Sequence, residues 1–332
     1  MSVDYRLLHA TEIDAAADLW GGLHGDPRQH EAWRREFRSL PQLLTHTRVA
    51  VAADGALLSI IHDWPLTVYG VDGQPQRVGR LSHVFTRPDA RRQGYASRLL
   101  EMTLAAMRDD GRLWALLRTS EEARALYGRY GWRPLPVRQI ACTAVAARPA
   151  ECAAGAAYTV RSYDPAHERG GWEVLAAIHR AYNTGRPLTA VRDAAYWRYI
   201  AARAGWWLTS DQAQIFVAAP AHQEAGVRAY AIATFSAARG FLVAEVGAWP
   251  GDEEALPALL VAIMRRAEGD SPAGRLYLPH DPMLEHALTT LGARVEDVWD
   301  DDYMVRAIAP GFDTRLLAPL PMAPGNVAWM LY

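Results

Sequence analysis

The chain has 332 residues, half of them hydrophobic, and a formal net charge of -2. This length is enough for two domains or one large domain, and the weak charge argues against a nucleic-acid-binding protein, which needs a basic face. There is no apolar run of membrane-spanning length and no signal-peptide pattern at the N-terminus, so the expected compartment is the cytoplasm. The two cysteines and the scattered histidines show no metal-ligand spacing, so no metal site is expected.

The first eighty or so residues predict short strands and two helices. Turn residues and alternating apolar residues mark the strands, and an Asp-Gly pair at 54–55 is a strong hairpin signal. The predicted elements are a strand over 5–9, a helix from 11 to 20 that residues 21–26 interrupt, a helix over 27–38, strands over 48–53 and 56–62, and a strand pair around Val68 and Val78.

A strand, a basic glycine turn and an apolar-periodic helix follow between Leu81 and Met107. The first N–H groups of such a helix have no intrahelical partner, and together with the positive end of the helix dipole they favour a phosphate. Gly94 lets the backbone approach the ligand closely, and Arg91 and Arg92 add positive charge. Neither GxxxxGK[ST] nor GxGxxG is present, so ATP and NAD are poor candidates for this anion.

The rest of the chain completes the first half, and the second half then repeats its order of elements. A small-residue linker over 148–155 separates the halves, and the turn after the strand that ends at Val246 is acidic where the first half is basic. The predicted elements are strands over 113–118 and 139–147 around a helix that contains Tyr127, then a strand over 158–161, helices over 165–182 and 192–203, strands over 214–219, 228–235 and 241–246, a helix over 253–268, a strand over 275–278, a helix over 282–291 and a strand over 293–307.

The turn Arg91-x-x-Gly94-x-Ala96, together with the segment from Ala123 to Trp132, resembles the GNAT superfamily of acetyl-CoA-dependent N-acetyltransferases. A plain α/β domain with a basic turn is the alternative. The succession of such a domain and a degenerate copy resembles the Eis acetyltransferases over Met1 to about Ala309. The resemblance implies an α/β protein of tandem GNAT folds, each a mixed sheet flanked by helices, in which only the first copy binds CoA. The expected domains are 1–150 (catalytic), 151–309 (degenerate) and a tail, 310–332.

The same resemblance assigns the binding of acetyl-CoA to the first domain. The backbone of the strand would pair with the pantetheine arm, the turn would hold the pyrophosphate, and two residues after the next strand would lie against the cofactor. These residues are Val84, Phe85 and Thr86 on the strand, Arg91, Arg92, Gln93, Gly94, Tyr95, Ala96 and Ser97 in the turn, and Ser120 and Glu121.

Three residues are candidates for moving protons. The resemblance makes Tyr127 the acid that protonates the departing CoA thiolate, although a tyrosine at this junction is also a common core residue. A protonated amine also needs a base. His83 is one candidate, because histidine titrates near neutral pH. The carboxylate of Tyr332, at the end of an apolar tail, is the other, with plain structural packing of the tail as the alternative.

Acidic and aromatic residues predict a cationic amine as the acceptor. By resemblance Asp26, Trp33, His83 and Asp300 line its pocket, where carboxylates attract ammonium groups and an aromatic face stacks a cation. The acidic run that contains Asp300 also suits a solvated edge strand. The sequence leaves open whether the amine belongs to a sugar, a polyamine or a peptide, and whether the chain is a homo-oligomer. A catalytically silent acyl-CoA-binding sensor is the rival function.

Overall fold

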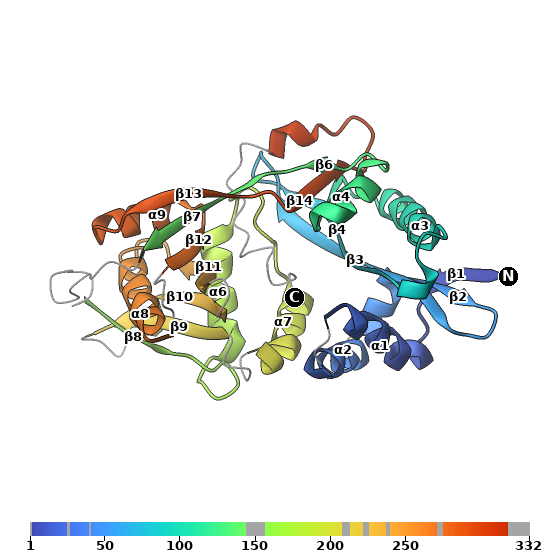
Figure 1. The fold of residues 1–332 in the computed structure, drawn as a ribbon. Coiled ribbons are helices and arrows are strands. Elements are labelled where there is room, and N and C mark those ends of the chain that lie inside the picture. The colour runs from blue at the N-terminus through green and yellow to red at the C-terminus, as the bar shows by residue number, and fades with distance from the viewer. Residues whose placement is uncertain are drawn as a thin grey trace. The chain divides into compact units, whose positions relative to one another are not determined.

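Two seven-stranded sheets with helices packed against them make up the chain, and the predicted α/β architecture is confirmed (Figure 1). The computed structural model describes residues 2–24, 27–39, 41–143, 157–207, 213–221, 226–236, 240–270 and 275–317. The first sheet and its helices comprise β1 (Val3–Leu7), η1 (Ala10–Glu12), α1 (Ile13–His24), α2 (Pro27–Ser39), η2 (Pro41–His46), β2 (Thr47–Ala52), β3 (Leu57–Tyr69), β4 (Pro75–Thr86), η3 (Pro88–Ala90), α3 (Tyr95–Asp109), β5 (Trp114–Arg118), α4 (Glu121–Gly128), β6 (Arg133–Pro134), β14 (Tyr303–Ala307) and η5 (Thr314–Leu317). The second comprises β7 (Val137–Thr143), β8 (Tyr158–Ser162), α6 (Gly171–Asn183), α7 (Ala194–Trp207), β9 (Ala213–Pro220), β10 (Ala229–Ser236), β11 (Gly240–Ala248), α8 (Ala255–Asp270), β12 (Arg275–Pro279), α9 (Pro282–Thr290) and β13 (Val295–Asp300).

The two sheets have corresponding strand orders. The first is β1-β2-β3-β4-β5-β14-β6, and the second, taken from its far edge, is β8-β9-β10-β11-β12-β7-β13. In each sheet the fourth and fifth strands are parallel, and a helix, α3 or α8, supplies the crossover that parallel neighbours require. The second half of the chain therefore repeats the architecture of the first.

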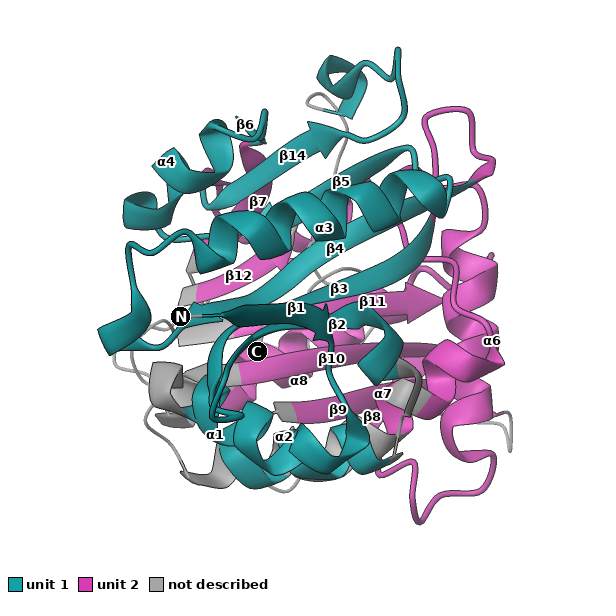
Figure 2. Cartoon of the chain, turned by 90° about the vertical axis from the view of Figure 1, so that its right-hand side faces the viewer, with its two compact units in different colours: residues 1–67, 76–135, 302–317 teal, residues 68–75, 136–301, 318–332 magenta. Residues whose placement is uncertain are grey.

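Strands β7 and β14 each join the sheet of the other half of the chain. β7 is predicted to belong to the first domain, but it pairs with β12 and β13, whereas β14 pairs with β5 and β6. A linker composition shows where strands stop but not which sheet they join. The two compact units accordingly consist of residues 1–67, 76–135 and 302–317 (unit 1) and of residues 68–75, 136–301 and 318–332 (unit 2), bounds that differ from the predicted 1–150 and 151–309 (Figure 2).

Two further elements differ from their predictions. Helix α1 continues through Gly21 to His24, and Gly21 leaves room for α2, because an added Cβ would clash with the ring of His30. The single strand predicted over 293–307 is divided after Asp300, and its two parts, β13 and β14, lie in different sheets. Side chains alternate along an extended segment whichever sheet it joins, so the sequence pattern does not show this change of sheet.

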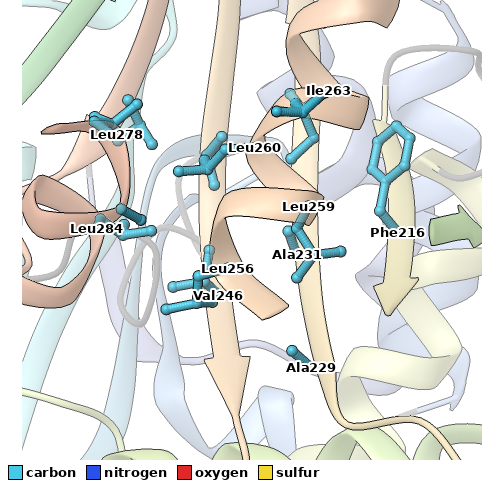
Figure 3. Packing of buried hydrophobic residues seen from close by; sticks show 14 of the residues in the cluster. Phe216, Ala229, Ala231, Val246, Leu256, Leu259, Leu260, Ile263, Leu278 and Leu284 are labelled. Carbon is cyan, nitrogen blue, oxygen red and sulfur yellow. The ribbon is translucent and has the colours of Figure 1, made fainter. Parts of the chain in front are cut away.

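The core of unit 2 lies between its sheet and helices α8 and α9. Leu256, Leu259 and Leu260 of α8 pack onto Ala229 and Ala231 of β10, where the small side chains let the helix approach the sheet (Figure 3). A second cluster, around Leu175 and Ile178 of α6, covers the other face. Within the described residues, no helix has the length and apolar character of a membrane span, and no three potential metal ligands gather.

Candidate active site

Strands β4 and β5 stay paired for only part of their length. Their parallel ladder ends with the pair Leu81–Leu117. β4 continues to Thr86, whereas β5 ends at Arg118. The stretch 82–86, which contains the predicted cofactor-binding residues of the strand, thus extends past the last pair with β5 and is available on that side to an extended ligand.

An unusual backbone conformation marks the start of this extension. His83 has φ +54°, in the left-handed region that residues with a Cβ rarely adopt. The indole Nε1–H of Trp20 on α1 donates a hydrogen bond of 2.9 Å to the carbonyl of His83. Nδ1 of the His83 ring lies 3.0 Å from the hydroxyl of Ser82. Backbone and ring of this residue are thus both held by specific partners.

The turn before α3 presents a row of backbone donors. Arg92 (φ +63°) and Gly94 (φ +86°) are both left-handed, and the first helical bond runs from Arg98 N–H to the Gly94 carbonyl at 3.0 Å. No hydrogen bond inside the described chain uses the N–H groups of residues 92–97. A Cβ added at Gly94 would have no atom within 4 Å, so the space in front of the turn is open. This arrangement fits a phosphate group.

Among the side chains of the turn, Arg91 is bonded back to β4, and the others are exposed or half-buried. Nε of Arg91 donates to the carbonyl of Thr86 at 3.2 Å, and its guanidinium lies 5.8 Å from the centre of the Phe85 ring. Arg91 thereby ties the turn back to β4. Arg92 is exposed, and the hydroxyl of Tyr95 donates to Oε1 of Gln93 at 2.8 Å. The remaining predicted residues, Ala96 and Ser97, are half-buried in the first turn of α3.

Helix α4 carries the predicted acid. Its N-cap, Ser120, and the next residue, Glu121, are exposed. Tyr127 is buried in the core next to Trp132, with 6.3 Å between ring centres. Burial raises the pKa of Tyr127 well above its ordinary value, so its phenol is neutral and holds a proton at neutral pH.

Helices α1 and α2 place aromatic rings over His83. Trp33, predicted to line the acceptor pocket, is buried and meets the His83 ring edge-on at 4.0 Å. The ring centre of Trp20 lies 4.2 Å from that of Trp33, 5.2 Å from that of Phe37 and 4.9 Å from that of His83. His62 on β3 is 6.1 Å from His83. Trp33 and His83, two of the predicted site residues, are therefore brought together in one aromatic cluster of unit 1.

Two residues of this cluster, Trp20 and His62, were not anticipated from the sequence. The Thr47 hydroxyl donates to the Leu43 carbonyl at 2.8 Å and therefore accepts from Nδ1–H of His62 at 2.7 Å, which fixes the tautomer of this buried ring. Both residues lie within apolar runs, where a histidine or tryptophan reads as ordinary core. The only sequence signal was the polar character of histidine in a strand that is otherwise buried.

Of the remaining predicted acceptor and base residues, one belongs to the other unit and two fall outside the described part of the chain. Asp300 ends β13, the edge strand of the second sheet, and belongs to unit 2. Its neighbours in the acidic run are engaged in ion pairs, Asp297 with Arg138 at 2.7 Å and Asp302 with Arg118 at 3.1 Å. Asp26 and Tyr332 lie outside the described residues.

A groove of about 450 Å³ adjoins β4 on the side of α1. Its two charged side chains already have partners: Asp18 pairs with Arg34, and Arg87 pairs with Asp89 at 2.6 Å. The groove is otherwise lined by apolar side chains and lies next to β4. Its lining consists of Ala15, Asp18, Leu19, Leu57, Phe85, Arg87 and Pro88.

Unit 2 has a buried carboxylate at the helix start that corresponds to the exposed Ser120 of unit 1. β11 and β12 form only the pairs 241–276 and 242–277. Asp281, the N-cap of α9 and thus the counterpart of Ser120 in α4, is buried and accepts from the Tyr182 hydroxyl at 3.1 Å and from Arg186 at 2.8 Å. The start of α9 is therefore closed by buried side-chain hydrogen bonds, whereas the start of α4 is exposed.

Comparison with known proteins identifies the fold around this site. Residues 4–135 match the family of the acetyltransferase (GNAT) domain. Similar solved structures include Eis1 from Mycobacterium abscessus (18% identity, TM-score 0.61, 92% of this chain and 74% of that one) and a GCN5-related N-acetyltransferase from Kribbella flavida (16%, 0.62, 92% and 71%). Another is a GCN5-related N-acetyltransferase from Anabaena variabilis ATCC 29413 (12%, 0.65, 93% and 73%). No curated protein matches the sequence. The chain therefore contains an acetyltransferase (GNAT) domain, which spans residues 4–135.

Proposed function

We propose that the chain transfers the acetyl group of acetyl-CoA to a primary amine of a cationic acceptor by direct attack. The observation that carries the proposal is the turn over 92–97, whose N–H groups have no hydrogen-bond partner in the described chain and which follows the part of β4 beyond its ladder with β5. A pyrophosphate fits the turn, and a pantetheine arm, which carries amide groups, fits the backbone of Val84, Phe85 and Thr86. Ser120 and Glu121 lie at the exposed start of α4, after the end of β5.

Acetyl-CoA, when bound, supplies a thioester whose acyl carbon bonds to the amine nitrogen as its carbon–sulfur bond breaks. The sulfur leaves with the electron pair of that bond, and Tyr127 gives it the phenolic proton. Burial makes this phenol a weak acid, but the departing thiolate is desolvated as well, which raises its own affinity for the proton. The proton lost by the amine goes to a base, and His83 and the carboxylate of Tyr332 are the two candidates.

The cationic character of the acceptor rests on the predicted pocket residues Asp26, Trp33 and Asp300. Carboxylates attract an ammonium group, and an aromatic ring stabilises it over its face. Asp300→Asn should raise the KM for the acceptor with no change in the Kd of acetyl-CoA. An unchanged KM would assign the acidic run to the solvated edge of the second sheet, where β13 lies.

The test of the function is acetyl-CoA consumption against a panel of amino sugars, polyamines and peptide amines, combined with calorimetric binding of acetyl-CoA. Turnover with at least one amine is the expected result. Measurable binding of acetyl-CoA without turnover across the panel would favour the silent sensor, and absence of both would contradict the assignment of the turn.

A matched pair of glycine variants tests the turn itself. Gly94 and Gly111 flank α3, both have positive φ (+86° and +67°), and a Cβ at either would have no atom within 4 Å. Gly94→Ala and Gly111→Ala should therefore lower the melting temperature by similar amounts. Only Gly94→Ala should weaken acetyl-CoA binding, by roughly tenfold or more, because only there does the change distort the donors of a phosphate. Equal affinities in the two variants would refute the site.

A further inference from the structure

The left-handed conformation of His83 needs a cause. A residue with a Cβ is strained at φ +54°, and such strain persists where surrounding contacts over-determine the backbone. His83 stands two residues beyond Leu81, the last residue of β4 in the ladder with β5. The strain is therefore located where the strand becomes available to a ligand.

Trp20 supplies the main fixed contact to this backbone. Its side chain is 1% exposed, and its Nε1–H donates to the His83 carbonyl at 2.9 Å. The rings of Trp33 and Phe37 pack against the indole, with 4.2 and 5.2 Å between ring centres. A buried indole N–H that lost this acceptor would be left unsatisfied, so the bond resists any rotation of the peptide.

The direction of the His83 carbonyl also sets the direction of the next N–H group. In a planar trans peptide the carbonyl of one residue and the N–H of the following residue point in opposite directions. Because the carbonyl of His83 points at Trp20, the N–H of Val84 points away from Trp20. Val84 is one of the strand residues to which the proposed function assigns the cofactor.

We propose that Trp20 is a positioning residue of acetyl transfer: by holding the peptide between His83 and Val84, it aims the Val84 N–H at the carbonyl oxygen of the thioester. This inference rests on the proposed function. Negative charge grows on that oxygen as the amine attacks, and a donor fixed in advance stabilises the charge without reorganising. Trp20 touches neither substrate and acts only through the peptide.

Trp20→Phe removes the donor and keeps an aromatic ring in the cluster. We expect kcat to fall by roughly tenfold, less than the loss of a whole oxyanion donor, because Val84 keeps its N–H and loses only its fixed direction. The Kd of acetyl-CoA should stay within about threefold, since the turn over 92–97 is untouched. Phe37→Leu is the matched control: it disturbs the packing of the same indole, and it should lower the melting temperature but leave kcat unchanged.

A double-variant cycle gives a readout that does not depend on activity. Glycine adopts positive φ without strain, so in a His83→Gly background the bond from Trp20 has less strain to oppose. Trp20→Phe should then lower the melting temperature by more than it does in the His83 background, because loss of the bond releases no strain at glycine. If Trp20→Phe does not fold, replacement of Trp20 by benzothienylalanine keeps the bicyclic shape, lacks the N–H, and takes its place in both measurements.

The outcomes separate this inference from the proposed function. A kcat that Trp20→Phe leaves unchanged, an equal loss of kcat in Phe37→Leu, or equal melting-temperature losses in the two backgrounds would overturn the role of Trp20. If the parent chain binds acetyl-CoA but acetylates no amine, the proposed function fails instead, and the melting-temperature cycle still decides whether Trp20 holds the peptide.

Discussion

Cutting the chain at its small-residue linker should produce a first fragment that does not fold. A fragment of residues 1–150 contains every α-helix described in unit 1 but lacks β14, which pairs with β5 and β6. The same fragment retains β7, whose partners β12 and β13 are then missing. It thus loses an internal strand of its own sheet and carries an orphan strand of the other.

The expected loss of stability is comparable to the whole stability of a domain. Tyr303, Met304 and Val305 are each no more than 3% exposed. At about 1.5–3 kcal/mol for each fully buried side chain, their removal costs roughly 5–9 kcal/mol. Domains are stable by only about 5–15 kcal/mol. The exposed edge of β5 and the apolar residues of β7, such as Ile140, also favour aggregation.

A relinked chain is the matched control. β6 and β14 are antiparallel, and Leu135 N–H donates to the Tyr303 carbonyl at 2.9 Å, so an Asn-Gly turn can join Leu135 directly to Tyr303. We expect the relinked polypeptide 1–135–Asn-Gly–303–317 to elute as a monomer, melt cooperatively by circular dichroism and bind acetyl-CoA, and the fragment 1–150 to do none of these. A fragment 1–150 that melts cooperatively and binds acetyl-CoA with the affinity of the full chain would refute the exchange of strands.

Three further predictions concern single groups. Tyr127→Phe should lower kcat on the order of 100-fold with little change in acetyl-CoA binding. Burial raises the pKa of Tyr127, so its ionisation in the unfolded chain opposes folding only above about pH 10. In urea titrations above that pH, Tyr127→Phe should therefore lose less stability than the parent. Glu245→Gln leaves the buried charge of Arg192 uncompensated and should lower the free energy of unfolding in urea by about 3–5 kcal/mol, whereas Asp297→Asn, in an exposed pair, should cost at most about 1 kcal/mol. Deleting residues 329–332 should abolish transfer and preserve acetyl-CoA binding; full kcat would exclude the Tyr332 carboxylate as base.

The sequence was most informative where chemistry depends on backbone and local order. The turn at Gly94 and the helix after it follow from residue types with clear backbone preferences: glycine readily takes the positive φ that the turn needs, and the structure has both elements in place. Arg91 shows the limit of this reasoning, because its charge suggested a phosphate ligand while its side chain braces Thr86 and Phe85. The residue type predicts which kinds of group a guanidinium can bind, but not which of them lies within reach in the fold.

Features that depend on distant pairing were not accessible from local patterns. β7 and β14 alternate like any half-buried strand, and nothing in their residues distinguishes one sheet from the other. Trp20 likewise looked like a core residue at the end of an amphipathic helix. Its bond to the carbonyl of His83, 63 positions away, arises only after α1 packs on β4.

The exchange of strands also explains how unit 2 can keep the fold of an acetyltransferase domain without the features of its cofactor site. The turn before α8 contains Asp252 and Glu253, which would repel a phosphate. Glu245 on β11 is fully buried: burial alone would raise its pKa, but the paired guanidinium of Arg192 at 3.0 Å holds that pKa below its usual range. Such side chains fit a packed interior rather than a ligand cleft. Since β7 completes the sheet of unit 2 and β14 completes that of unit 1, neither sheet is whole without the other half of the chain, and this dependence preserves the second fold independently of any chemistry there.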